Sequence, residues 1–341
     1  MSGLVVAVVG ATGAVGREMW RLVASGALPV LRAIPYTSAR SAGTELSFRG
    51  TTLPAIELSS ETFEPVDLAL FSAGAGVARE WAPRFVAAGS VVVDNSSAFR
   101  KDSSVPLVVP ELNGQTLEPG VRLVANPNCS TIQMVVALAP LHRAWGLRSV
   151  KVATYQSASG AGARALAELL EGTRQHLEGG VEEPRIFPHP LAFNVIPQVG
   201  DFDAAGESIE ERKMRDETRR ILGLPDLLLS ATCVRVPVLR AHSEAVWASF
   251  DDLPDPRRAA LLLRDAGVVV EDDPNASRYP LPRAAAGRPD VFVGRLRADP
   301  SDPRGLVFWV VSDNLLKGAA TNAVQVAEAL LNRGLLARSA T

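Results

Sequence analysis

A buried strand followed by a glycine-rich turn opens the chain and restricts the folds that it can adopt. Leu4 to Val9 is an unbroken apolar run, which is typical of a strand covered on both faces of a parallel sheet. Gly10, Gly13 and Gly16 follow at once, and a helical stretch then continues to Val23. A strand, a glycine turn and a helix in this order indicate a dinucleotide-binding unit.

The alternation of strands and helices continues to about Pro127. Further strands are predicted at residues 32–36, 66–71 and 91–94, with a helical apolar periodicity over residues 77–85. Alternation of this kind indicates an α/β fold, and we expect a Rossmann-type, doubly wound parallel sheet with right-handed crossovers.

The pattern changes in the second part of the chain, where strands are joined by short links without a helix each time. This arrangement predicts an α+β domain with a mixed, largely antiparallel sheet. A proline-rich stretch at 184–199 is expected to be irregular, and residues 272–288 are expected to form a surface loop or lid. The strands are predicted at 150–156, 233–238, 245–250, 291–297 and 306–311, and the helices at 161–177, 208–222, 257–266 and 315–331.

Length and composition limit the classes of protein. A chain of 341 residues exceeds the usual size of one domain, so two domains are expected. The net charge of −2 and the lack of a basic run give no sign of a nucleic-acid partner. Two cysteines do not make a disulfide framework, which suits a reducing cytoplasm. No apolar segment reaches ~20 residues and no signal peptide is evident, so we expect a cytoplasmic enzyme without a membrane span.

The glycine turn and two later loops are the expected cofactor site. The loop after the second strand, residues 36–41, has three side-chain hydroxyls besides Tyr36 and one guanidinium but no carboxylate. An NAD site usually has a carboxylate there, so the set favours the 2′-phosphate of NADP. A solvated polar loop and a glycine turn without a ligand are the alternatives. The expected cofactor-binding residues are Gly10, Thr12, Gly13, Ala14, Val15, Gly16, Ser38, Arg40, Ser41, Ser72, Ala73 and Gly74.

Cys129 is the candidate nucleophile. It lies in the segment Asn126-Pro127-Asn128-Cys129-Ser130-Thr131, between an apolar strand and an apolar run of helical length. A thiol at a helix N-terminus faces unpaired N–H groups, which favour the thiolate and lower its pKa. The alternative is a buried, inert cysteine. A thiolate beside a nicotinamide indicates attack on an activated carbonyl, formation of a thioester and hydride transfer.

Several polar residues could serve such a thiolate. Arg100 follows a strong strand, and Gln156 ends another strand before the polar turn 157–162. Glu210 and Lys213 share a helix face, although such a pair is usually a solvated ion pair. No cluster of metal ligands is evident, so we expect no metal.

Arg235 and His242 are seven residues apart. On an unbroken strand this odd separation would place them on opposite faces, so a turn or bulge at residues 237–241 is needed to bring both into one site. Arg235 could instead form an ion pair at a sheet edge. The other histidines, at 142, 176 and 189, have no partner that the sequence identifies, and spacing alone does not favour His242 over them.

The chain resembles the bacterial aspartate-semialdehyde dehydrogenases, and the resemblance spans nearly the whole sequence. One departure is the turn Arg240-Ala241, where many members of the family have glycine. The segments that carry the resemblance occur in the family's order and are 10–16, 94–100, 126–131, 154–162, 192–198, 234–245 and 312–322.

The resemblance implies roles for individual residues. Cys129 would be the nucleophile, His242 its general acid/base, and Gln156 would orient the acyl intermediate. Arg235 and Glu210 would hold the α-carboxylate and α-amino groups of the substrate. The remaining implied residues are Arg100, Asn128, Lys213 and Ser157 for the substrate, with its phosphate, and Ser159, Gly160 and Asn314 for the cofactor.

The resemblance also implies an activity and a domain arrangement. The activity is the reversible NADP-dependent reductive dephosphorylation of L-4-aspartyl phosphate to L-aspartate 4-semialdehyde, toward lysine, threonine and methionine. Residues 1–127 and 313–341 would form a discontinuous dinucleotide-binding domain. Residues 128–312 would form the catalytic domain, whose sheet would associate into a homodimer or homotetramer. The alternatives are an N-acetyl-γ-glutamyl-phosphate reductase and a non-catalytic NADP-binding paralogue.

Overall fold

The chain folds into two compact units. The computed structural model describes residues 3–181 and 183–336. Residues 1–2, 182 and 337–341, which belong to the predicted domains, lie outside this described part. The N-terminal unit comprises the residues up to Asn128 together with those from Ala319 onward, and the central unit comprises Cys129–Gly318. Each unit is built around one six-stranded sheet.

The sheet of the N-terminal unit is entirely parallel in its strand pairs. Its strand order is β5-β2-β1-β6-β7-β8, so the chain winds outward from β1 first in one direction and then in the other. The predicted doubly wound fold is therefore confirmed. The strands are β1 (Leu4–Val9), β2 (Val30–Thr37), β5 (Ile56–Glu57), β6 (Leu68–Phe71), β7 (Val91–Asp94) and β8 (Leu123–Ala125).

Helices cover both faces of this sheet, which explains the unbroken apolar run of β1. Val6 and Val8 pack in one cluster with α1 (Ala14–Ala24) and α9 (Thr321–Asn332). Ala7 and Val9 point the other way and pack with α2 (Ala75–Ala87). Because α9 lies nearly 200 residues after the other elements of its cluster, the chain must return to the N-terminal unit at its end.

The central unit has a mixed sheet with the order β10-β9-β11-β14-β13-β12. The three central pairs are antiparallel and the two outer pairs are parallel, as expected for a largely antiparallel sheet. The strands are β9 (Leu147–Gln156), β10 (Leu228–Arg235), β11 (His242–Phe250), β12 (Val269–Val270), β13 (Val291–Asp299) and β14 (Asp302–Ser312).

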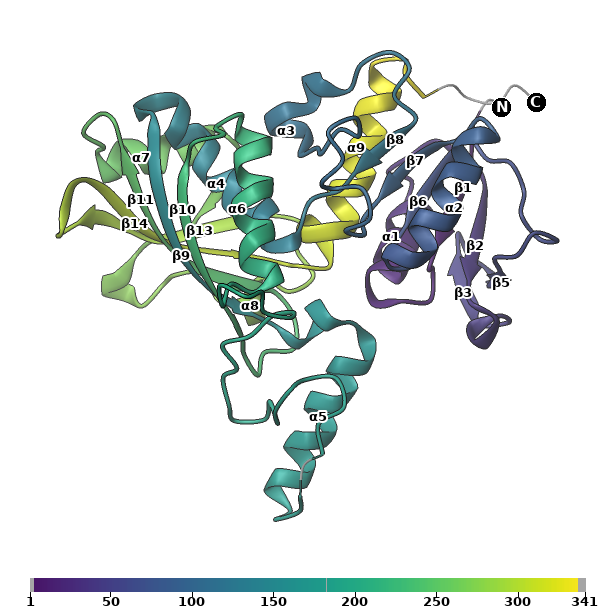
Figure 1. Cartoon of the computed structure of the whole chain (residues 1–341), viewed down its shortest axis with the longest axis horizontal. Helices are drawn as coiled ribbons and strands as arrows, with labels where there is room; N and C mark the ends of the chain where they lie inside the picture. Colours follow the sequence, from purple (N-terminus) through teal and green to yellow (C-terminus); the bar gives the residue numbers. More distant parts are fainter. Residues whose placement is uncertain (1–2, 182, 337–341) are drawn as a thin grey trace. The chain divides into compact units, whose positions relative to one another are not determined.

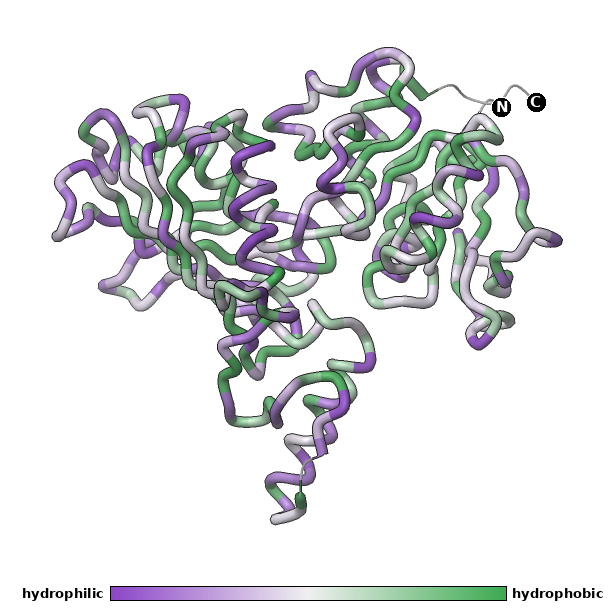
Figure 2. The backbone as a smooth tube through the Cα atoms, viewed as in Figure 1, coloured by the Kyte–Doolittle hydropathy of each residue, from purple (hydrophilic) through white to green (hydrophobic). Residues whose placement is uncertain are grey.

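Helix α4 (Cys129–Trp145) is the buried centre of this unit. It contacts the sheet and also α6 (Ile209–Leu222) and α7 (Pro256–Asp265). Figure 2 shows the strands as largely hydrophobic and α6 as largely hydrophilic. The helix α5 (Ala163–Leu177) packs with the proline-rich stretch in a small separate cluster and extends away from this sheet (Figure 1).

Some predicted boundaries were wrong. The predicted strand 233–238 is β10, which ends at Arg235, because Pro237 cannot donate to the sheet. The predicted helix 315–331 begins instead as a π-helical turn over Leu316–Ala320 and continues as α9. The loop 272–288 contains the short helices η4 (Pro274–Ala276) and α8 (Pro282–Ala285).

The polar hairpin of β3 (Glu45–Phe48) and β4 (Thr51–Pro54) was not predicted, nor were η1 (Ala39–Ser41), α3 (Pro110–Asn113), η2 (Gly114–Thr116) and η3 (Ala158–Ala161). In the described part of the chain, no helix combines the length and the apolar character needed to cross a bilayer.

Candidate active site

The glycine turn after β1 is so crowded that side chains cannot replace its outer glycines. Gly10 has φ +88°, and a Cβ there would lie 2.4 Å from the carbonyl oxygen of Ser72. A Cβ on Gly16 would lie 1.9 Å from the Gly10 oxygen. The Gly10 N–H donates to the backbone carbonyl oxygen of Tyr36 at 2.8 Å. The turn therefore touches the ends of both β2 and β6, which is where doubly wound sheets bind ligands.

The predicted 2′-phosphate loop follows β2 directly. Ser38 directly precedes the short 3₁₀ helix η1 (Ala39–Ser41), which includes the exposed Arg40. At the start of the loop the hydroxyls of Thr37 and Thr12 are 2.7 Å apart, which ties the glycine turn to the end of β2. These residues lie at one edge of the N-terminal unit, so the pyrophosphate of a dinucleotide and a phosphate on its ribose 2′ position could be bound together.

A network of asparagines that was not predicted lies at the carboxyl ends of β7 and β8. The Asn126 amide donates to Asn95 Oδ1 at 2.7 Å, and the Asn322 amide donates to Asn126 Oδ1 at 2.7 Å. Arg100 donates to the Asn95 carbonyl at 2.8 Å. The network joins α9 to the loop that carries Arg100 and to the segment that ends at Asn128. Asn126 and Asn322 both lie in segments of family resemblance, which was the available signal.

Cys129 is the first residue of α4, as the sequence predicted. It is partly exposed, whereas the second cysteine, Cys233, is fully buried and burial raises its pKa. A Cβ added to Gly318 would lie 3.0 Å from the Cys129 Cβ. A glycine at position 318 therefore lets the π-helical turn approach the first residue of α4 closely, a contact that the sequence did not reveal.

His242 is the first residue of β11 and is completely buried. The Ser157 N–H donates to its Nδ1 at 3.1 Å, and the Ser157 hydroxyl lies at the same distance. Its Nε2 has no hydrogen-bond partner among the described residues. Burial, followed by the positive charge of Arg235, lowers the pKa of His242 to about 3. The imidazole is therefore neutral at neutral pH.

The expected substrate residues come together at one end of the central sheet. Gln156 and Arg235 are register partners at the carboxyl ends of the parallel strands β9 and β10. Gln156 Nε2 donates to Glu210 Oε1 at 3.3 Å, and Lys213 Nζ lies 3.2 Å from Glu210 Oε2. Arg235 Nη1 donates to the Ser157 carbonyl at 2.7 Å. Glu210 is only 6% exposed and the Lys213 side chain about one quarter exposed, so this ion pair is largely buried and does not lie on a solvated helix face. Arg235 is also buried.

The turn that the sequence required between Arg235 and His242 is present. The chain leaves β10 at Arg235, and Ala241 has φ +72° immediately before β11 begins. The backbone reverses the parity of the strand, so both side chains reach the same region. A Cβ on Gly160 would lie 2.8 Å from Arg235 Nη1 and 3.1 Å from His242 Nε2, which shows how closely the two groups flank this glycine.

Asn314 is tied to the same cluster. Its Oδ1 accepts hydrogen bonds from the hydroxyls of Ser157 and Ser159, at 3.1 and 3.0 Å, and from the Ala241 N–H at 3.0 Å. The side-chain oxygen of this expected cofactor residue is thus used to fix two turns. Cys129, His242 and the expected substrate residues Gln156, Glu210, Lys213 and Arg235 therefore belong to the central unit, whereas Arg100, Asn128 and the glycine turn belong to the N-terminal unit.

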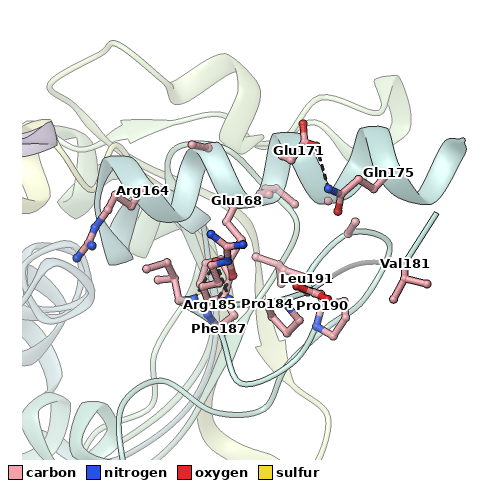
Figure 3. Close-up of a pocket in the computed structure, with 16 residues that line it drawn as sticks. Arg164, Glu168, Glu171, Gln175, Val181, Pro184, Arg185, Phe187, Pro190 and Leu191 are labelled. Carbon is pink, nitrogen blue, oxygen red and sulfur yellow. Dashed lines mark hydrogen bonds between the residues drawn. The ribbon is translucent and has the colours of Figure 1, made fainter.

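A separate pocket of about 530 Å³ lies between α5 and the proline-rich stretch (Figure 3). The Glu168 carboxylate closes one side by accepting from the N–H groups of Arg185, Ile186 and Phe187 at 2.9, 2.8 and 3.1 Å. None of the expected site residues lines this pocket.

The described residues contain no group of histidine, cysteine and carboxylate side chains suited to a metal ion.

Comparison with known proteins defines the class of this fold and site. The family model described as "Semialdehyde dehydrogenase, NAD binding domain" matches residues 5–119, and "Semialdehyde dehydrogenase, dimerisation domain" matches residues 138–317. The two matches follow the N-terminal and central units, so the chain belongs to the class of semialdehyde dehydrogenases, which have a NAD-binding and a dimerisation domain.

Individual relatives narrow this class. Aspartate-semialdehyde dehydrogenase of Bacillus subtilis is 47% identical over 98% of this chain and 99% of its own length, and that of Aquifex aeolicus is 46% identical over 98% and 100%. Aspartate semialdehyde dehydrogenase II of Vibrio cholerae has a solved structure with a TM-score of 0.93 and 41% identity, covering 97% of this chain and 99% of that one. The chain belongs to the aspartate-semialdehyde dehydrogenase family.

Proposed function

We propose that the chain catalyses the reversible, NADP-dependent reductive dephosphorylation of L-4-aspartyl phosphate to L-aspartate 4-semialdehyde, a step toward lysine, threonine and methionine. The relatives' names support the substrate, and the structure from Vibrio cholerae was solved in complex with ASA. The observation that carries the proposal is the buried group of Glu210, Gln156 and Arg235. It offers a carboxylate to an amino group and a cation to a carboxylate, which suits a free amino acid backbone.

Cys129 is the proposed nucleophile, because it begins a 17-residue helix whose N-terminal N–H groups favour a thiolate. In acylation, its Sγ bonds to the acyl carbon of the substrate while the bond from that carbon to the phosphate oxygen breaks and phosphate leaves. The reduced nicotinamide, when bound, supplies the hydride that turns the thioester into the aldehyde and releases the thiolate. Neutral His242 is the proposed acid/base, and Gln156 orients the acyl group.

The leaving phosphate requires cationic partners, and we assign this role to Arg100 and Lys213 together with Asn128. The support is chemical, since two cations and an amide donor suit a phosphate dianion. Ser157 is assigned to the substrate site because its carbonyl and N–H hold Arg235 and His242. Ser159, Gly160 and Asn314 are assigned to the cofactor side.

We infer that NADP is the preferred cofactor. The loop after β2 offers Ser38, Arg40 and Ser41 and contains no carboxylate between residues 36 and 41. A related structure from Candida albicans, 25% identical with a TM-score of 0.73, was solved with NADP.

We assign roles to the two units accordingly: the N-terminal unit binds the nucleotide, the central unit performs the chemistry, and residues 272–288 act as a lid.

We also propose that the enzyme is a homodimer, or a homotetramer built from it, in the cytoplasm. The face of the central sheet opposite α4 carries exposed apolar side chains, with Tyr155 and Trp247 each 39% exposed and Leu228 68% exposed. A family dimerisation domain covers these strands. An apolar sheet face of this kind indicates a surface that another copy would cover.

The proposal is tested by phosphate-dependent reduction of NADP with aspartate semialdehyde and, in parallel, with N-acetylglutamate semialdehyde. We expect turnover only with the first, because the Glu210 carboxylate is useless to an acetylated amino group. Glu210→Gln should lower kcat/KM for aspartate semialdehyde by at least tenfold. Preference for the acetylated substrate would support the sister reductase instead, and binding of NADP without turnover of either would support a non-catalytic paralogue.

A further inference from the structure

The residue before His242 has an unfavourable backbone conformation. Ala241 has φ +72°, in the left-handed region, and its side chain is completely buried. This region is unfavourable for residues with a Cβ, and such residues persist there only where their surroundings hold them. Since His242 follows directly, relaxation of Ala241 would rotate the peptide that sets the direction of the imidazole. Something must therefore hold this turn.

Two adjacent residues that directly follow β14, Asp313 and Asn314, hold it. Arg240 Nε donates to Asp313 Oδ2 at 2.6 Å, and the Ala241 N–H donates to Asn314 Oδ1 at 3.0 Å. The Asp313 carboxylate is fully buried, whereas the Arg240 side chain is about one quarter exposed. A charge-assisted bond to a buried carboxylate is stronger than a surface ion pair, because solvent screens it less.

Asp313 also holds the turn beneath the nucleophile. Its Oδ1 accepts from the Leu315 N–H at 2.9 Å, and its carbonyl accepts from the Gly318 N–H at 3.1 Å. Gly318 is the residue against which the Cys129 Cβ packs. One residue therefore connects the turn that carries His242 with the turn that touches Cys129. Its Oδ2 additionally accepts from the Gly287 N–H at 2.6 Å, at the end of the 272–288 loop.

We propose that Arg240 and Asp313 are positioning residues, whose ion pair keeps Ala241 left-handed and thereby aligns the His242 imidazole with Cys129. Neither residue needs to contact the substrate. The inference rests on the proposed function for its role in catalysis, although the alignment itself can be measured without any substrate. It makes a specific claim: the ion pair matters because residue 241 is strained, so its importance should disappear when the strain is removed.

The test is a double-mutant cycle of Arg240→Met and Ala241→Gly, with Arg240→Lys as the conservative variant. Met keeps most of the apolar stem of arginine but not the charge. We expect R240M to lower kcat about tenfold, with little change in the KM for NADPH, because a side chain misplaced by a fraction of an ångström slows the chemical step. Glycine tolerates positive φ, so R240M in the A241G background should recover most of that loss. R240K should lie between R240M and the unmodified chain.

A second measurement uses no substrate. The rate at which iodoacetamide alkylates Cys129, followed by mass spectrometry across a pH series, reports on the base that faces the thiol. R240M should shift this pH profile, and the double variant should shift it back. A double variant that remains as impaired as R240M in both measurements would overturn the coupling, as would R240M with an unchanged kcat and an unchanged pH profile of alkylation.

If the unmodified chain lacks turnover, the proposed function fails, and the alkylation rates of the four variants of the cycle still decide this inference. If R240M alone does not fold, the comparison of the double variant with A241G decides it: a tenfold lower kcat there would refute the claim.

Discussion

Gly160 offers the sharpest perturbation of the active site, because a single methyl group would press on two of its functional groups. A Cβ at this position would lie 2.8 Å from Arg235 Nη1, 3.0 Å from His242 Cε1 and 3.1 Å from His242 Nε2. Neither group can give way freely. Arg235 Nη1 is bonded to the Ser157 carbonyl, and the imidazole is held by the Ser157 N–H.

The magnitude follows from these distances. Non-bonded heavy atoms are most stable at roughly 3.5–4.0 Å, so the guanidinium and the imidazole must each move by roughly 0.5 Å or more. A misplacement of about 1 Å can slow a reaction about 100-fold, and half of that suggests a loss of about tenfold or slightly more. Overpacking in a dense interior costs about 1–3 kcal/mol, which should appear as a lower Tm. We therefore expect Gly160→Ala to lower kcat about tenfold and to raise the KM for aspartate semialdehyde.

The assay is the phosphate-dependent reduction of NADP, with kcat and both KM values measured separately. Gly76→Ala is the matched control, because a Cβ there meets no atom within 4 Å and the residue lies in helix α2. The control should keep its kinetic constants, and its Tm should not fall, because alanine is more favourable than glycine within a helix. If Gly160→Ala raises only the KM for NADP, the glycine faces the cofactor and not the imidazole. If all kinetic constants stay the same, the claim that Gly160 packs tightly against Arg235 and His242 is refuted.

Three further predictions concern other parts of the molecule. Cys129→Ser should abolish turnover while NADP binding, followed by fluorescence titration, survives; retained turnover would exclude a covalent intermediate at this residue. Arg40→Ala should raise the KM for NADPH at least tenfold more than the KM for NADH, and equal effects would remove the 2′-phosphate assignment. Burial raises the pKa of Glu244 well above its usual range, so the folded state holds this proton more tightly than the unfolded state and loses stability as pH rises above about 4.5. Urea unfolding across a pH series should therefore show Glu244→Gln gaining stability over the unmodified chain, by up to about 1.4 kcal/mol per pH unit; a constant difference would refute the burial argument.

The elements that were predicted well are those with one dominant local signal. β1 spans Leu4–Val9 as predicted, because burial on both faces leaves an unbroken apolar run. α4 begins at Cys129, because Pro127 and the two asparagines favour a turn before it. Elements without such a signal were missed, such as the hairpin of β3 and β4, because each strand has only four residues and only β3 alternates between exposed and buried positions.

The composition of the active site could be predicted only in part. Residue types and family resemblance supplied Cys129, His242 and Gln156, but the contacts that orient them connect residues far apart in the chain. Asp313 and Arg240 are 73 positions apart, and no local pattern pairs them. The crowding at Gly318 is equally invisible, because a glycine in a sequence does not reveal what its missing side chain would touch.

If the substrate binds at Arg235 as proposed, this buried cation links substrate binding to the protonation of His242. Arg235 is the second cause, after burial, of the lowered His242 pKa, while the Glu210 carboxylate acts in the opposite direction. A substrate carboxylate bound at Arg235 adds negative charge beside that cation, so the pKa of His242 must rise when substrate binds.

The pH dependence of the two kinetic constants tests this link. The dependence of kcat/KM reports the free enzyme, and that of kcat reports the complex. We therefore expect the acid limb of kcat to lie at higher pH than the acid limb of kcat/KM. Arg235→Lys provides a comparison, because it keeps the charge but not the planar, two-pronged contact with a carboxylate. Acid limbs at the same pH, or in the reverse order, would mean that Arg235 does not bind the substrate's negative charge.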